Sequence, residues 1–215
     1  MTQDDLFYHP AGIKQFNGDE QKIQVTQRYK FKVVLNTRVK EYHWTAIYVP
    51  PGERITVEIP KKAVNYVWAN INRQVNHTDS YNERLKDLKC QIKMTNEVNK
   101  FGWPYGGNLE FLTFVDYFPS GLEIYVTGGI RMPHFQYGVT TEEEWEDLNS
   151  NLPAPVAVVD CGNMLGVGPS EKLLQQSRLN DALAFWRSVG QIFYSLNDVY
   201  NYPVRADGRI KEPIN

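Results

Sequence analysis

The sequence has few of the residues that would fix its chemistry. Its 215 residues include two cysteines and four histidines, and the formal net charge is −2 at pH 7. Cys90 and Cys161 lie far apart in strand-like segments, so we favour two small buried thiols over a disulfide between them. The small net charge provides no overall field for nucleic acid or anionic lipid, and we expect no nucleic-acid partner.

Long hydrophobic stretches are also missing. No segment approaches the roughly 20 apolar residues that a transmembrane helix needs, so we expect no membrane span. The N-terminal segment 1–5 contains two aspartates and lacks the apolar core of a signal peptide. The sequence leaves the compartment open: the protein would be secreted if the chain is part of a longer exported protein, and cytoplasmic otherwise.

Signatures of catalysis are absent too. The four histidines are isolated from one another, so no pair lies four residues apart on a helix beside a glutamate, as a hydrolytic zinc site requires. The sequence contains no Gly-x-Ser-x-Gly elbow, phosphate-binding loop or Gly-x-Gly-x-x-Gly fingerprint. We expect these residues alone to be non-catalytic and to hold no metal or other cofactor.

Alternation of apolar and polar residues is abundant, and it predicts a mainly β protein. It begins at Ile23 and Val25 and becomes regular over 29–35, where the odd-numbered residues would share a buried face. Further segments of strand character lie at 43–60, 64–71, 88–94, 109–115, 122–126, 156–159 and 164–167. Within 43–60, the Pro51-Gly52 turn predicts a hairpin-like pair of strands.

Helix signals are confined to the last third of the chain. Thr141 followed by Glu144 predicts a capping box and a helix that ends before Pro153, and Ser170 is a second candidate cap. A short helical turn is also expected over 81–87. From Asn180 onward, apolar residues recur at spacings of three and four, which predicts an amphipathic helix. These apolar positions are Leu183, Trp186, Val189, Ile192 or Phe193, and Leu196.

Together these patterns predict an antiparallel, jelly-roll-like β-sandwich followed by a C-terminal amphipathic α-helix, with one or two short helices. The expected domains are a polar leader at 1–20, a β-sandwich at 21–168, a helical segment at 169–198 and a turn-rich tail at 199–215.

Two loops contain candidate binding residues. Trp103 and Tyr105 could offer an aromatic platform to a sugar ring or a peptide, or could simply cap the sandwich. His77 and Asp79 follow a predicted strand and could hold a ligand, or could satisfy the local backbone.

A series of short motifs resembles the enhancin-like zinc metallopeptidases, a mucin-degrading family of the gluzincin type. The motifs, in the family's order, are AIYVPPGE at 46–53, ITV at 55–57, HTD at 77–79, PYGGNL at 104–109, PHFQYG at 133–138, EW at 144–145, LPAP at 152–155, VGPS at 167–170 and FW at 185–186. The resemblance covers about 33–196. The chain departs from the family's pattern at Ala46, where a glycine is usual, and at Val156, where a tryptophan is frequent.

The family's His-Glu-x-x-His motif does not occur in the sequence, so the resemblance assigns no catalytic residue. It implies the N-terminal, non-catalytic portion of a peptidase module that acts on mucin-like glycoproteins, packed beside the module's C-terminal catalytic helices, with zinc only in those helices. The alternatives are a free-standing glycan- or protein-binding sandwich, and an assembly domain that docks a partner through its helix.

Overall fold

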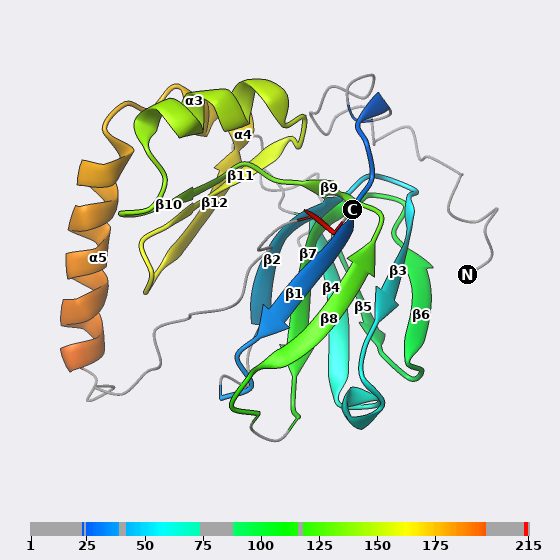
Figure 1. The fold of residues 1–215 in the computed structure, drawn as a ribbon. Helices are drawn as coiled ribbons and strands as arrows, with labels where there is room; N and C mark the ends of the chain where they lie inside the picture. Colours follow the sequence, from blue (N-terminus) through cyan, green and yellow to red (C-terminus); the bar gives the residue numbers. More distant parts are fainter. Residues whose placement is uncertain are drawn as a thin grey trace, which may run out of the picture. The chain divides into compact units, whose positions relative to one another are not determined.

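The computed structural model describes residues 23, 25–38, 42–73, 88–115, 118–196 and 213–214 (Figure 1). These residues form two compact units. The first comprises the described residues of 27–130 together with 213–214, and the second comprises Ile23, 25–26 and 131–196.

The first unit is a sandwich of two five-stranded sheets. Sheet A contains, in spatial order, β13 (Pro213–Ile214), β1 (Lys30–Leu35), β8 (Leu122–Thr127), β3 (Arg54–Glu58) and β6 (Val98–Gly102). Sheet B contains β5 (Leu88–Lys93), β4 (Val67–Arg73), β7 (Gly107–Thr113), β2 (Tyr42–Val49) and β9 (Ile130–Arg131). The pairs β1–β8, β3–β6, β4–β7 and β2–β7 are antiparallel.

The core of the sandwich consists of residues that alternate along the strands. In β1, Phe31, Val33 and Leu35 are buried, while the residues between them are half-buried. The same period of two buries Ile55 and Val57 in β3. Successive side chains of a strand point to opposite faces, so one set fills the core and the other meets solvent. The predicted β-sandwich with a C-terminal helix is confirmed.

The predicted hairpin at 43–60 is wrong, because its two strands belong to different sheets. β2 pairs with β7 in sheet B, whereas β3 pairs with β6 and β8 in sheet A. The turn itself is present, and Gly52 adopts a φ of 73°. A Pro-Gly turn specifies a chain reversal but not the neighbour of each strand, so the segment forms a corner between the two layers.

Other predicted boundaries also change. Ile23 and Val25 are helical, and Val25 is 84% exposed, so the strand starts only at Lys30. Residues 64–66 form a turn after the 3₁₀ helix η2 (Lys61–Ala63), and β4 begins at Val67. The helical turn expected at 81–87 lies outside the described residues.

The second unit combines a three-stranded sheet with helices. β10 (His134–Gln136) runs parallel to β11 (Val156–Asp160), and β12 (Leu165–Pro169) runs antiparallel to β11. The helices are α3 (Glu142–Asn151), α4 (Ser170–Leu174) and α5 (Leu179–Leu196). Their shared core consists of Phe135, Trp145, Ala157, Cys161, Leu179 and Leu183.

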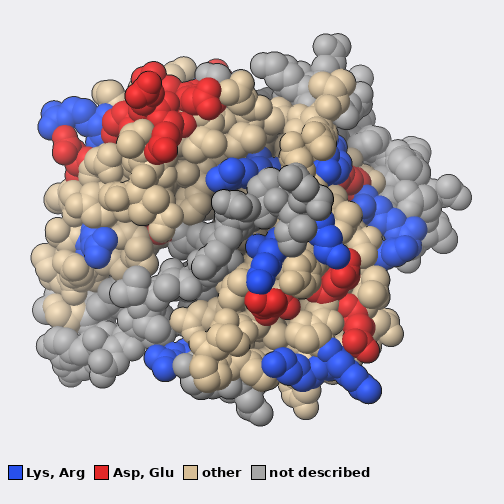
Figure 2. All heavy atoms as spheres, viewed as in Figure 1, with Lys and Arg blue, Asp and Glu red and all other residues tan. Residues whose placement is uncertain are grey.

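The predicted capping box of α3 is confirmed. Thr141 Oγ1 accepts a hydrogen bond from the Glu144 amide at 3.1 Å, and a Glu144 carboxylate oxygen accepts one from the Thr141 amide at 2.8 Å. Acidic side chains gather over this helix in Figure 2, beside the positive end of its dipole. The predicted cap at Ser170 is wrong, because the N-cap residue of α4 is Pro169 and Ser170 Oγ donates to the Ala154 carbonyl at 2.6 Å.

The division into units differs from the expected sandwich over 21–168. Residues 131–168 belong with the helices, since β10, β11 and β12 form a sheet of their own. Alternation shows that a segment can be a strand, but it does not show which sheet the strand joins.

Candidate binding surfaces

The aromatic loop, residues 103–106, is fixed to the corner between β2 and β3. The Trp103 carbonyl accepts hydrogen bonds from the amides of Gly52 and Gly106, both at 3.0 Å. Gly106 has a φ of 65°, and a Cβ there would lie 2.6 Å from the Val49 carbonyl oxygen. Only glycine suits this close approach, which explains the Tyr-Gly-Gly sequence of the loop.

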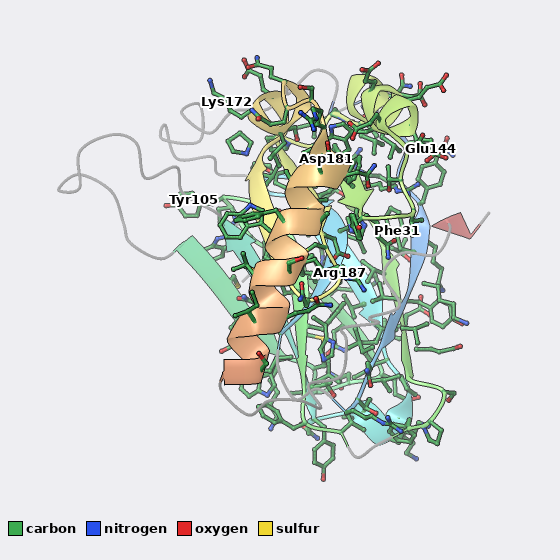
Figure 3. The ribbon with its side chains drawn as sticks, turned by 90° about the vertical axis from the view of Figure 1, so that its left-hand side faces the viewer. Phe31, Tyr105, Glu144, Lys172, Asp181 and Arg187 are labelled. Carbon is green, nitrogen blue, oxygen red and sulfur yellow. The ribbon has the colours of Figure 1, made fainter. Side chains whose placement is uncertain are left out.

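Two of the predicted binding residues lie together in this loop. The rings of Trp103 and Tyr105 are 5.6 Å apart and tilted by 53°, and Tyr105 is labelled in Figure 3. Trp103 also packs against the sandwich core, and its indole Nε1 is buried without a hydrogen bond. His77 and Asp79 lie outside the described residues. Ligand binding by these four residues remains a prediction.

Glu53, which follows the Pro-Pro-Gly turn, also fixes the corner between β2 and β3. Its carboxylate accepts from Arg28 Nε at 2.9 and 3.0 Å and from the Gly129 amide at 2.6 Å. A second guanidinium nitrogen of Arg28 lies 2.7 Å away. The arrangement is a charge-assisted clamp that joins three segments of the chain.

The outer face of sheet B, turned away from the sandwich core, is rich in aromatic and polar side chains. Strand register places the residues of this face in three rows. The rows are Lys93–Trp68–Leu112–Tyr42, Gln91–Asn70–Glu110–Trp44 and Lys89–Asn72–Asn108–Tyr48. The first row is partly open to solvent, and the second and third contain buried polar groups.

The buried amides in these rows are incompletely hydrogen-bonded. Asn70, Glu110 and Asn108 are 3%, 4% and 1% exposed. Asn70 Nδ2 donates to Glu110 Oε2 at 3.0 Å, but Asn70 Oδ1 has no partner, and neither Oδ1 nor Nδ2 of Asn108 has one. An unsatisfied buried polar group costs about 1–3 kcal/mol, so these amides mark an unusual place in the sheet.

β2 is irregular beside these amides. Trp44 pairs with Glu110 and Tyr48 with Asn108, so the ladder is interrupted by a bulge between Trp44 and Tyr48. Ala46, inside the bulge, has a φ of 59°, which is unusual for a residue other than glycine. Thr45 fixes the bulge, because its hydroxyl donates to the Leu109 carbonyl at 2.7 Å and accepts from the Ile47 amide.

Titratable groups form no metal centre in the described part of the chain, where no cluster of three or more histidine, cysteine, aspartate or glutamate residues could hold an ion. His134 Nε2 lies 3.5 Å from Asp160 Oδ2 in the second unit. Among the described residues both cysteines are free, and burial raises the pKa of the Cys90 thiol. No described helix is both long enough and apolar enough to span a membrane.

Both units match known families. Residues 5–127 match the N-terminal domain of M60-like peptidases, and residues 128–215 match peptidase M60, enhancin and enhancin-like. The chain belongs to the M60-like peptidase family. The boundary between the two matches lies beside the division between the compact units at 130 and 131.

Relatives of this M60-like chain are distant and much longer. The TRPM8 channel-associated factor 3 of Rattus norvegicus is 24% identical over 135 residues, which are 60% of this chain and 14% of the relative. The chain spans a fifth or less of the length of the curated relatives it matches.

Solved structures share the fold at low identity. IMPa from Pseudomonas aeruginosa in complex with an O-glycopeptide has a TM-score of 0.58 at 17% identity, over 86% of this chain and 23% of that one. IMPa has also been solved in complex with T-antigen. A structure of the CBM32-1, CBM32-2 and M60 catalytic domains of Clostridium perfringens ZmpB has a TM-score of 0.56 at 14% identity, over 82% of this chain and 21% of that one.

The long helix α5 of the M60-like chain is apolar on two sides. Leu179 and Leu183 are buried in the core of the second unit. Phe185 and Ile192, in contrast, are 62% and 59% exposed, and Trp186 is 50% exposed. The predicted single apolar stripe therefore splits, with Leu183 in the core and Trp186 and Ile192 at the surface. Figure 3 shows α5 along its length, with Asp181 and Arg187 labelled.

Proposed function

We propose that this chain is the non-catalytic front portion of an M60-like module that acts on mucin-like glycoproteins. The sandwich would contribute substrate binding or structural support, and the second unit would begin the peptidase domain. The observation that carries this proposal is the pair of adjacent family matches, which divide the chain where the structure divides.

The substrate class is supported by structural relatives. IMPa has been solved with an O-glycopeptide and with T-antigen. The fold of IMPa matches 86% of the length of this chain. A glycan attached to a peptide is therefore the ligand class to test first.

The exposed side of α5 supports packing against further helices. Phe185 and Trp186 form an edge-to-face pair with ring centroids 5.6 Å apart, and Ile192 lies one to two turns further along. A helix that is apolar on more than one side is normally buried between neighbouring elements. We propose that the catalytic helices of the same module cover this side, with the zinc held there rather than in these residues.

The test compares this chain with the complete product of its gene. We expect the complete product to bind zinc, to cleave an O-glycosylated mucin peptide and to lose that activity with a chelator. The 215-residue chain alone should leave the peptide intact. A gene that encodes no zinc motif, or a zinc-loaded product that cleaves no O-glycopeptide, would contradict the proposal.

The aromatic loop supports a second candidate, a free-standing module that binds glycan or protein through Trp103 and Tyr105. The tilted ring pair and the half-buried position of both side chains favour it. Titration with an O-glycopeptide should then weaken when both residues are changed to alanine. Binding that survives the double substitution would count against this loop.

A third candidate, an assembly domain, is supported by the same exposed side of α5. It predicts that Trp186, which is exposed, and Phe193, whose side chain lies outside the described part of the chain, form an interface with a separate partner protein. Cross-linking from α5 distinguishes this candidate from the first, because it reports whether the covering helix belongs to the same polypeptide or to another.

A further inference from the structure

We propose that the outer face of sheet B binds a saccharide. In this arrangement the buried amides Asn70 and Asn108 and the Glu110 carboxylate hold sugar hydroxyls, and Trp68 and Tyr42 form the platform for the ring. The inference names the part of the substrate that the sandwich recognises, and it rests on the proposed function only for the choice of sugar probe.

Asn108 is the main reason to expect a ligand. Its side chain is 1% exposed, yet both of its amide atoms lack hydrogen bonds. The opposing residue on β2, Tyr48, is 3% exposed, so the Asn108 side chain is not hydrated by bulk water. Buried polar side chains almost always have partners, and an exception needs an explanation such as a bound molecule.

The chemistry of the unpaired atoms favours a hydroxyl group. Asn108 needs both a donor and an acceptor, and Asn70 Oδ1 needs a donor. A cation would satisfy the oxygens but not Asn108 Nδ2, and Glu110 is the only carboxylate in the three rows. The same carboxylate disfavours an anion. A hydroxyl both donates and accepts, so a polyol satisfies all of these atoms at once.

The open first row suits the apolar side of a sugar ring. Trp68 is half-buried, Tyr42 is 38% exposed, and Lys93 Nζ lies 5.8 Å from the centroid of the Trp68 ring. Aromatic side chains combine a large apolar surface with a polar tip, which matches the alternating C–H and O–H surfaces of a saccharide. The open row is adjacent to the Asn70–Glu110 row along the strands, so one ring can contact both. The Asn108 row lies one row further, where only a second ring of the same saccharide would reach it.

Among the described residues, an exposed hydrogen bond spans this face. Gln91 Nε2 donates to Tyr42 Oη at 3.1 Å, and these two residues come from β5 and β2, with β4 and β7 between them. The bond therefore crosses the outer side of the sheet between the open row and the Asn70–Glu110 row. An exposed bond of this kind contributes little stability, so a ligand can replace it at low cost.

The test is a titration of the ¹⁵N-labelled 215-residue chain with N-acetylgalactosamine, followed through the side-chain amide signals of asparagine. We expect the Asn70 and Asn108 signals to shift at millimolar sugar. Asn108→Ala and Glu110→Gln should each weaken binding by about tenfold or more, whereas the Trp103→Ala, Tyr105→Ala double variant should stay within about twofold of the unmodified chain.

Two further variants keep the test decisive if Asn108→Ala does not fold. Trp68→Ala changes only the open row and should also weaken binding. Lys100→Ala, on sheet A, is the matched control and should change nothing.

Three results would overturn the inference. They are amide signals that do not move with sugar, sugar binding that is unchanged in every sheet B variant, and saturation of the site by calcium alone. The outcome is separable from that of the proposed function. A complete gene product that cleaves O-glycopeptides while the sheet B variants bind sugar normally would leave the proposed function standing and the saccharide site excluded. Sugar binding at sheet B by a gene product without a zinc motif would leave the saccharide site standing and the proposed function excluded.

Discussion

At the scale of single residues, the 46–53 motif is explained by what its last residue does. Glu53 receives hydrogen bonds from Arg28 and from the Gly129 amide, so one carboxylate joins the start of β1, the corner and the β8–β9 turn. The side chain of Glu53 is 19% exposed and that of Arg28 is 29% exposed. Partial burial limits screening by solvent and gives this pair more weight than a surface ion pair.

Replacing Glu53 with glutamine should destabilise the sandwich by about 1.5–3 kcal/mol, the range for hydrogen bonds to a charged group. The glutamine keeps the size of the side chain but loses the charge that pairs with Arg28. Urea unfolding measures the change. Glu123→Gln, which removes an exposed ion pair with Lys32, is the matched control and should be indistinguishable from the unmodified protein. Equal effects of the two substitutions would show that the clamp adds no stability.

Cys90 should react slowly with alkylating reagents. Burial raises the pKa of its thiol, so less of the reactive thiolate is present at a given pH. Because the folded-state pKa of Cys90 is the higher one, the contribution of this thiol to folding stability is complete below the unfolded-state pKa. That contribution is lost as the pH rises through the folded-state pKa. Iodoacetamide labelling of a Cys161→Ser variant, measured against pH, should have its midpoint above that of a cysteine peptide. A midpoint at or below the peptide's would contradict the burial effect.

Among the secondary-structure elements, the sequence predicts the features that depend on residues close together in the chain. The β1 alternation and the Thr141 capping box depend on neighbours a few residues apart, and both are confirmed. The Pro51-Gly52 turn predicts a hairpin, but the segment forms a corner because the partners of β2 and β3 are distant strands. Ser170 has the residue type of a cap, but its hydroxyl is taken by the Ala154 carbonyl.

Thr141→Ala should destabilise the second unit by about 1 kcal/mol, because the Glu144 amide loses its capping oxygen. Thr141→Ser keeps the oxygen and should recover most of the loss. Thermal unfolding of both variants provides the measurement. An alanine variant as stable as the serine variant would exclude a stabilising role for this cap.

Replacing Gly190 in α5 with alanine should destabilise the chain, although alanine is the better helix former. Alanine normally improves a helix by up to about 1 kcal/mol over glycine. Here a Cβ would lie 2.7 Å from Asn163 Nδ2, and Asn163 is held by its bond to the Arg187 carbonyl at 2.9 Å. We expect Gly190→Ala to destabilise the chain, and the same change in an Asn163→Ala background to stabilise it. A double-mutant cycle measures this reversal, and additive effects would rule out the clash.

At the scale of the whole molecule, the candidate site depends on contacts that no local pattern contains. Asn70 and Glu110 are 40 residues apart in sequence and meet only because β4 and β7 pair. In the sequence each looks like an ordinary polar residue on the solvent side of a strand. The aromatic loop, in contrast, was found because its Trp, Tyr and Gly residues are contiguous.

The exposed side of α5 can be distinguished from its buried side by substitution. Phe185→Glu combined with Ile192→Lys should leave the unfolding free energy of the 215-residue chain nearly unchanged, because both side chains face solvent. Leu183→Ala on the buried side of the same helix should cost about 2–5 kcal/mol, since it opens a cavity in the core. Urea unfolding compares the two.

The same Phe185→Glu, Ile192→Lys pair should act differently in the complete gene product. If further helices of the module cover this side of α5, the charges would be buried there without partners and the product should unfold earlier or lose its activity. An effect on the 215-residue chain as large as that of Leu183→Ala would show that this side already belongs to the core. A complete product that tolerates both charges would leave the catalytic helices without this docking surface and would favour a separate partner.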